Sequence, residues 1–232
     1  MSKSYKNILA TVLLVIISVY TGLNNTKQTS PKQNKQLTKQ EVSKSSKNVL
    51  ALSWYNYFCK THTFKKECKN RSKSKYKNQF VLHGLWPQPR NNINCNKTKL
   101  QLNIQTLNEL KIYMPGVASN LHKHEWSKHG TCYSNNATKY FQDSISLTKE
   151  FNSLFAKFFK QKNGQIITKN MIVKLFNKKL FHGAGKKFKL ICKNGFIKEI
   201  RLNIYGQVTS LKDTLKKAPN IFGGCTKGKL SF

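Results

Sequence analysis

Residues 187–206, KFKLICKNGFIKEIRLNIYG, alternate between apolar and polar side chains on both sides of Asn194-Gly195. An Asn-Gly pair between two alternating runs is a strong hairpin signal, because both residues tolerate the positive φ angles that the favoured two-residue turn requires. The stretch therefore predicts two antiparallel strands that are joined by a turn at residues 194–195. The fold is expected to contain a sheet that includes this hairpin.

Two further strands are predicted upstream of this hairpin. VLALSWYNYFC at 49–59 has the aromatic-rich composition of a buried strand, and QFVLHGLWP at 79–87 predicts a strand from Gln79 to Leu85 that Pro87 stops. Four segments have apolar residues at helical spacing or helix-end signals. These are residues 106–113, residues 120–130 with Gly130 as the end, residues 144–159, and residues 168–180 with Thr168 as the N-cap.

Strands and helices are mixed without a regular βαβ alternation, and no internal repeat is found. This order predicts the α+β class, with a central, mostly antiparallel sheet flanked by helices. The 232 residues are enough for one domain with a substantial core.

The charge of the chain indicates a polyanionic partner. Lys and Arg number 42 against 8 Asp and Glu, which gives a formal net charge of +34. Self-repulsion on this scale is typical of proteins that bind nucleic acid or anionic surfaces. The alternative is a composition bias, since Lys and Asn are abundant throughout the chain.

The N-terminal part divides into a leader and a linker. In residues 1–23, Lys3 and Lys6 precede an apolar run from Ile8 to Tyr20, which suits a signal-peptide core better than a membrane span. No A-x-A cleavage site is visible, so an uncleaved N-terminal anchor remains an alternative. Residues 24–48 contain almost no apolar residues and predict a disordered basic linker. The folded domain is expected to occupy residues 49–232.

The cysteine count supports export to an oxidising compartment. All six cysteines follow the leader, and three disulfides are expected, although six cysteines allow 15 pairings that spacing cannot resolve. No C-x-x-C pair occurs, which argues against a zinc ribbon or a thioredoxin-like site. The cysteines are Cys59, Cys68, Cys95, Cys132, Cys192 and Cys225.

HEWSKHGTC at 124–132 places one of the few acids between two of the few histidines. On a helix, His124, Glu125, Lys128 and His129 can address one side, while Trp126 points away and can anchor the helix in the core. Surface ion pairing between Glu125 and Lys128 is the simplest alternative. A metal site formed by histidines 122, 124 and 129 is disfavoured, because His124 and His129 are five residues apart and no HExxH spacing occurs.

FVLHGLWPQP at 80–89 is the second unusual segment. His83 is expected at the end of a strand, next to Trp86 and Pro87, where it could form the wall of a cleft. If the fold brings His83 and His129 together, one imidazole could take the proton of an RNA 2′-hydroxyl. The other imidazolium could then give a proton to the leaving 5′-oxygen. Lys128 would stabilise the charge that develops on the phosphate, with Glu125 as a working acid in a cationic site.

These two segments resemble the active-site segments of the ribonuclease T2 family of secreted endoribonucleases, in the family's order. LALSWYNYFC at 50–59 resembles the family's first strand, and the resemblance runs from about Val49 to the C-terminus. It implies a metal-free, cofactor-free cleavage of RNA to 2′,3′-cyclic phosphate ends. His83 would be the general acid and His129 the general base. His124, Glu125 and Lys128 would contact the scissile phosphate, and Trp86 would stack near the first base site.

The family pattern also implies the disulfides Cys95–Cys132 and Cys192–Cys225, which leaves Cys59–Cys68. Gln88 stands where many family members have a base-binding Asp, so broad base specificity is expected. Tyr55 stands where the family commonly has Pro.

The prediction is therefore a secreted or periplasmic, monomeric endoribonuclease acting on single-stranded RNA, with strongly salt-dependent affinity. Its pH profile should be bell-shaped and centred on roughly pH 5–7. The alternative is a catalytically silent cationic protein of the same fold that binds RNA or anionic membranes. A metal-dependent nuclease is a third hypothesis, which activity in chelator would eliminate.

Overall fold

The computed structural model describes residues 46–232. The predicted leader, residues 1–23, lies outside the described residues, as does all but the last part of the predicted linker, residues 24–48. Strand β1 begins at Lys47, two residues before the expected start of the domain. Within the described range, no helix has the length and apolar character needed to cross a membrane.

The described residues form one six-stranded sheet with the strand order β2-β1-β5-β6-β3, while β4 pairs with β5. Every pairing is antiparallel except that of β5 with β6. The α+β prediction with a mostly antiparallel sheet is confirmed. The strands are β1 (Lys47–Trp54), β2 (Phe80–Pro87), β3 (Ile166–Thr168), β4 (Phe188–Lys193), β5 (Phe196–Tyr205) and β6 (Lys227–Lys229).

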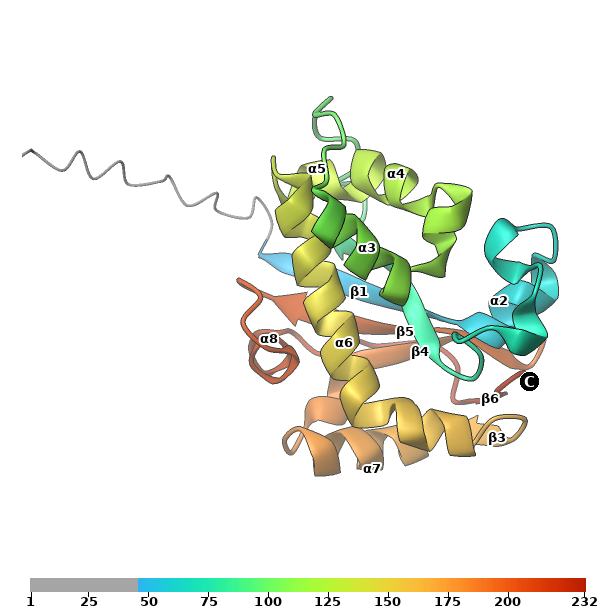
Figure 1. The fold of residues 1–232 in the computed structure, drawn as a ribbon. Helices are drawn as coiled ribbons and strands as arrows, with labels where there is room; N and C mark the ends of the chain where they lie inside the picture. Colours follow the sequence, from blue (N-terminus) through green and yellow to red (C-terminus); the bar gives the residue numbers. More distant parts are fainter. Residues whose placement is uncertain (1–45) are drawn as a thin grey trace, which may run out of the picture. The chain divides into compact units, whose positions relative to one another are not determined.

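Helix α6 crosses one face of this sheet, and α7 follows it at one end of the fold (Figure 1). Helices α3, α4 and α5 gather at the other end of α6. The α-helices are α2 (Tyr55–Thr61), α3 (Ile104–Tyr113), α4 (Leu121–Glu125), α5 (Thr131–Tyr133), α6 (Ala137–Gln161), α7 (Lys169–Lys179) and α8 (Leu211–Lys217). The short helical turns are η1 (Lys66–Cys68), η2 (Arg71–Lys73), η3 (Pro115–Ser119), η4 (Trp126–Gly130) and η5 (Ala184–Lys186).

The two faces of the sheet differ because side chains alternate along each strand. On β1, Leu50 and Leu52 are fully buried and pair with Leu202 and Ile200 of β5. This face packs against an aromatic cluster contributed by the sheet, α6 and α7: Trp54, Phe80, Phe151, Phe155, Phe159, Phe176 and Phe188. The opposite face carries Ala51 and Ser53 of β1 beside Arg201 and Glu199 of β5, so it is small and polar.

The hairpin prediction and the start of α7 are confirmed. Asn194 and Gly195 both have positive φ between β4 and β5, and the side chain of Thr168 accepts a hydrogen bond from the Met171 amide. The prediction of one strand over 49–59 is wrong in its second half, because the strand ends at Trp54 and α2 begins at Tyr55. In this helix Tyr55 and Phe58 pack in a separate small cluster with Cys59, Cys68 and Val81, while Tyr57 belongs to the main core. Tertiary packing thus overrides their preference for strands.

Candidate active site

A β-bulge in β2 positions His83. Gly84 pairs with Ala51 and Leu82 pairs with Leu52, so His83 is the extra residue between two neighbouring pairs. In a regular strand, His83 and Trp86 would point to opposite faces. The bulge puts both on the polar face, where their rings lie 5.2 Å apart in an edge-on arrangement. The expectation that His83 ends the strand is therefore wrong, since β2 continues to Pro87.

Gly84 allows a close approach beside the bulge. A Cβ atom at this position would lie 2.0 Å from the Glu125 carboxylate and 2.6 Å from the Trp86 indole nitrogen. The missing side chain is therefore what lets the α4 segment bring its carboxylate down onto β2.

The segment HEWSKHG does not form one regular α-helix that Gly130 ends. Helix α4 stops at Glu125, a π-turn follows from Trp126 to Gly130, and α5 continues to Tyr133. Gly130 has ordinary helical φ, and a Cβ there would strike the Trp126 ring at 2.3 Å. The role of Gly130 is therefore to make room for Trp126, which is 2% exposed and donates a hydrogen bond to the carbonyl of Thr98. Because a π-turn has more residues per turn than an α-helix, histidines five apart can face the same space.

A cleft of about 370 Å³ collects the predicted site residues from β2 and from the α4–η4 segment. The cleft is strongly cationic, because Arg90, Lys128 and Arg201 line it together with the histidines. Its predicted members are His83, Trp86, Gln88, His124, Glu125, Lys128 and His129. His122 is buried and does not line this cleft.

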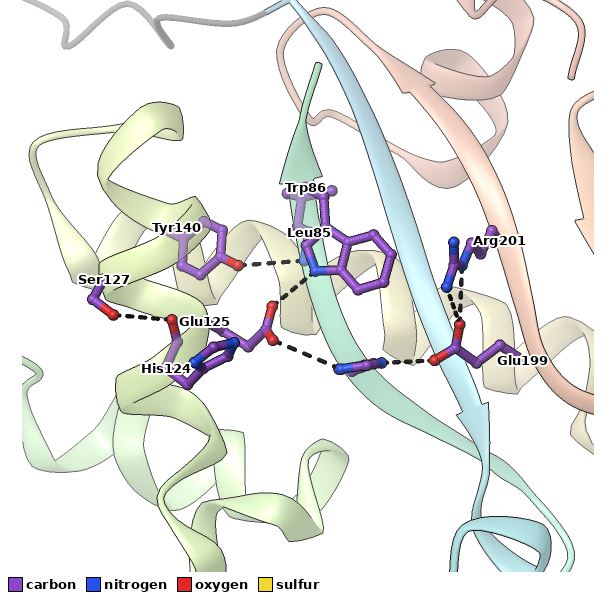
Figure 2. A network of polar contacts seen from close by, with 9 residues as sticks. Leu85, Trp86, His124, Glu125, Ser127, Tyr140, Glu199 and Arg201 are labelled. Atoms are coloured by element: carbon purple, nitrogen blue, oxygen red, sulfur yellow. Dashed lines mark hydrogen bonds and ion pairs between the residues drawn. The ribbon is translucent and has the colours of Figure 1, made fainter. Parts of the chain in front are cut away.

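His83 lies between two buried acids. Its Nδ1 is 2.8 Å from Glu199 Oε1, and its Nε2 is 3.7 Å from Glu125 Oε1 (Figure 2). The imidazole is 31% exposed, whereas both carboxylates are nearly inaccessible, at 2% for Glu125 and 1% for Glu199. The histidine is therefore the most exposed member of this group, although Glu125 also lines the cleft.

The same network continues to Trp86 and Arg201. The Trp86 Nε1–H donates to Glu125 Oε2 at 2.8 Å, and the Arg201 guanidinium donates two hydrogen bonds to Glu199 Oε2, at 2.9 and 2.7 Å. The guanidinium also lies 4.8 Å from the centre of the Trp86 ring. Figure 2 shows the two carboxylates facing each other, with Trp86 beside one and Arg201 beside the other. The indole is thus held between an acid and a cation.

The pKa values of the two site histidines are displaced in opposite directions. Burial opposes the charged form of His83. The hydrogen bond that its Nδ1 donates to Glu199, together with the charges of Glu125 and Glu199, outweighs burial and raises the pKa of His83. Burial, assisted by the nearby cations of Lys128, His124 and His83, lowers the pKa of His129 to about 4. At mildly acidic pH, His83 is therefore protonated more readily than His129. This is the arrangement that general acid–base catalysis needs.

The imidazole of His129 can work through only one nitrogen. Its Nδ1 is buried and has no hydrogen-bond partner among the described residues. Proton exchange between this imidazole and a ligand in the cleft must therefore use Nε2. The ring lies 5.5 Å from the Trp86 ring, so both site histidines are neighbours of the indole.

The two buried acids also differ from each other. Burial raises the pKa of Glu125, although its cationic neighbours and the Trp86 hydrogen bond act against this. Burial would likewise raise the pKa of Glu199, but the hydrogen bond and charge of His83, together with Arg201, lower it to about 2. Glu199 is therefore the acid that stays ionised.

Glu199 and Arg201 are the residues that the sequence interpretation missed. The signal was available, since Glu199 is one of only 8 acids in the chain and the only acid in FIKEIRLNIY. In a strand, residues two apart point to the same face, so Glu199 and Arg201 are expected to be neighbours. The rarity argument that singled out Glu125 applies equally to Glu199.

A second hollow of about 530 Å³ meets the first at His83 and His124. Besides the sheet strands, its walls come from α2, the loop before η1, and the segment from η3 to the start of α4, and they include Phe58, Phe64 and Asn120. His83 and His124 therefore lie between the two hollows rather than at the bottom of one.

The structure contains the disulfides Cys59–Cys68, Cys95–Cys132 and Cys192–Cys225. Cys95–Cys132 fastens the loop after β2 to α5. The Asn94 amide, which donates to the Lys128 carbonyl, and the Asn96 side chain, which donates to the Thr131 carbonyl, reinforce this link. The loop and the π-turn that carries Lys128 and His129 are thus one unit.

Replacing Cys95 and Cys132 together with serine is expected to cost about 4 kcal/mol of unfolding free energy, because the bridge closes 37 residues. The pair Cys192 and Cys225 closes 33 residues and should cost about the same, which makes it a matched control. The RNA cleavage that the sequence leads us to expect should, among the folded proteins, fall only in the Cys95/Cys132 variant. Equal catalytic losses in the two variants, measured beside denaturant unfolding curves, would contradict this role.

No three histidine, cysteine, aspartate or glutamate side chains within residues 46–232 are grouped so that they could hold a metal ion. The grouping of histidines 122, 124 and 129 that was considered from the sequence is therefore not present.

Comparison with known proteins points to one family. Residues 45–216 match the sequence model of the Ribonuclease T2 family. Ribonuclease I of Escherichia coli is 25% identical over 197 residues, which is 67% of this chain and 74% of that protein. Human ribonuclease T2 is 35% identical over 94 residues, which is 34% of this chain and 36% of that protein.

Solved structures agree at the level of the fold. The crystal structure of human RNase T2 superposes with a TM-score of 0.53 at 21% identity, covering 80% of this chain and 96% of that one. A mutant of RNase MC1 in complex with 5′-UMP superposes with a TM-score of 0.55 at 20% identity, covering 73% of this chain and 91% of that one.

Proposed function

Since this chain belongs to the ribonuclease T2 family and is an endoribonuclease of that family, we propose that it cleaves single-stranded RNA by transesterification, with His83 and His129 as acid and base. The observation that carries the proposal is that His83 and His129 line one cationic cleft, and the opposite displacement of their pKa values supports the assignment of their roles.

In this mechanism neutral His129 takes the proton of the 2′-hydroxyl through Nε2. The 2′-oxygen attacks phosphorus, the bond from phosphorus to the 5′-oxygen breaks, and protonated His83 gives its Nε2 proton to the departing oxygen. The products are a 2′,3′-cyclic phosphate and a free 5′-hydroxyl, and the two histidines end with exchanged protonation states. No metal or cofactor takes part.

Lys128 and His124 line the same cleft and would stabilise the negative charge that develops on the non-bridging oxygens. Glu125, whose pKa burial raises, lies 3.7 Å from His83 Nε2 and can hydrogen-bond a phosphoryl oxygen when it is protonated. This gives the acid in HEWSKHG a role in the site rather than in a surface ion pair.

The two hollows that meet at His83 and His124 suit an internal phosphodiester, which carries a nucleotide on each side. On one side the Trp86 ring, held by Glu125 and Arg201, is a stacking platform for a base, with Gln88 nearby. A stacking platform accepts every base, so broad base specificity is proposed.

A bell-shaped pH dependence of kcat/KM is expected. Activity should rise with pH as His129, with a pKa of about 4, loses its proton. It should fall again above the ordinary histidine value of about 6.5, where His83, with its raised pKa, finally deprotonates. Initial rates on a short RNA at constant ionic strength measure this profile. A profile that is flat between pH 4 and 8 would contradict the two-histidine mechanism.

The compartment and partners follow from the chemistry of the chain. Three disulfides persist in oxidising surroundings, so we place the enzyme outside the cytosol, in the periplasm or the medium. We further propose that it acts as a monomer. The net charge of +34 would make RNA affinity strongly salt-dependent and permits nonspecific binding to other anionic surfaces. The same charge is the observation that supports the alternative function, a catalytically silent protein that binds RNA or membranes.

A further inference from the structure

The sequence-based mechanism assigns no task to Glu199, although it is the acid in closest contact with a site histidine. The residue is fully buried on the polar face of β5, and its two oxygens are divided between two partners. Oε1 accepts from His83 Nδ1 at 2.8 Å, and Oε2 accepts from Arg201 at 2.7 and 2.9 Å. A buried carboxylate in a sheet is costly unless it is fully paired, and this one is.

We propose that Glu199, held by Arg201, is the positioning residue that fixes the orientation of His83 and keeps it protonated as the general acid. This inference rests on the proposed function, because it assigns a partner to one of the two catalytic histidines.

The geometry selects which nitrogen of His83 carries the mobile proton. An ionised carboxylate only accepts hydrogen bonds, so Nδ1 must keep its hydrogen toward Glu199 in both protonation states. The proton that comes and goes is therefore on Nε2, the nitrogen on the side of Glu125 and the cleft.

Arg201 has a separate task, which is to keep Glu199 charged. Without a second partner, a buried carboxylate next to an imidazolium could take its proton and leave both groups neutral. The two hydrogen bonds from Arg201 contribute to lowering the pKa of Glu199 to about 2, so it remains an anion throughout the working range. Glu125 cannot replace it, because burial raises the pKa of Glu125.

The charged groups around His83 come from several elements. Glu199 and Arg201 lie on β5, Glu125 and His124 lie on α4, and Lys128 and His129 lie on η4. Arg90 lines the same cleft from the loop after β2, and the second hollow is lined by His62, Lys65, Glu67 and Lys198. Only Glu125 and Glu199 favour the imidazolium, and Glu199 is the one that is hydrogen-bonded to it.

The test compares Glu199→Gln and Glu199→Asp with the wild type in the full, oxidised chain. Gln keeps the size but removes the charge, whereas Asp keeps the charge on a shorter side chain. Glu109→Gln on α3, outside the cleft lining, is the matched control for loss of an acid. Near-UV circular dichroism checks that each variant is folded, and the readouts are the pH profile of kcat/KM and the NMR titration of His83.

For Glu199→Gln, the alkaline limb of the profile should move to lower pH, so that the loss of activity is about tenfold or more at pH 8 and smaller at pH 5. The His83 titration should move in the same direction, while Glu199→Asp restores much of the shift and Glu109→Gln leaves both unchanged. A loss that is equal at every pH, with an unmoved His83 titration, would show a purely structural role and overturn the proposal. If the wild type cleaved no RNA, the proposed function would fail, but the His83 titration would still decide whether Glu199 holds its proton.

Discussion

Replacing His83 with alanine is expected to lower kcat/KM for RNA about 10³-fold, because the departing 5′-oxygen then leaves as an unprotonated alkoxide. RNA binding should be nearly unchanged, since Arg90, Lys128 and Arg201 remain in the cleft. His83→Gln is the companion variant, because its amide can still donate to Glu199 but cannot deliver a proton at working pH. It protects the experiment against loss of folding, because the buried Glu199 Oε1 would otherwise lose its hydrogen-bond partner, His83.

A substrate with an activated leaving group tests whether His83 acts by protonating the leaving group. A nucleoside 3′-(4-nitrophenyl phosphate) releases nitrophenolate, which departs without being protonated. His83→Ala should therefore lose much less activity on this ester than on RNA. Equal losses on both substrates would mean that His83 is not the general acid. Unchanged RNA cleavage would favour the silent binding protein or another site.

Replacing His129 with alanine is expected to lower kcat/KM by about 10³-fold on both substrates, because activation of the 2′-hydroxyl is needed whichever group leaves. The acid limb of any remaining activity, which we assign to the His129 pKa of about 4, should disappear as well.

Replacing His182, a histidine outside the cleft lining, is the control for this variant. Both proteins should keep wild-type unfolding midpoints within the scatter of surface variants, because the buried Nδ1 of His129 has no hydrogen-bond partner within residues 46–232. A selective loss on RNA with full activity on the nitrophenyl ester would reverse the acid and base assignments.

The sequence predicted those parts of the fold that local rules determine. Asn194-Gly195 turned the hairpin and Thr168 capped α7, because each acts through its own backbone and near neighbours. The two active-site segments were recognisable because both are long and unusual in composition. Their residues meet in one cleft, as the two-histidine hypothesis required.

The features that could not be predicted all depend on long-range packing. The bulge at His83 is visible only in the pairing of β2 with β1, and it is what brings His83 and Trp86 to one face. The π-turn at Trp126–Gly130 follows from fitting Trp126 against Gly130 and the Thr98 carbonyl. The contact of Glu199 with His83 spans 116 residues, which no local pattern reports.

The most direct test of the central claim is the chemistry of the cut ends. The oxidised protein is incubated with single-stranded RNA in excess chelator, beside His129→Ala, and the fragments are analysed by mass spectrometry. The account predicts 2′,3′-cyclic phosphate ends and 5′-hydroxyl ends from the wild type, and almost none from the variant. Intact RNA that is tightly bound at low salt, or cleavage that chelator abolishes, would contradict it.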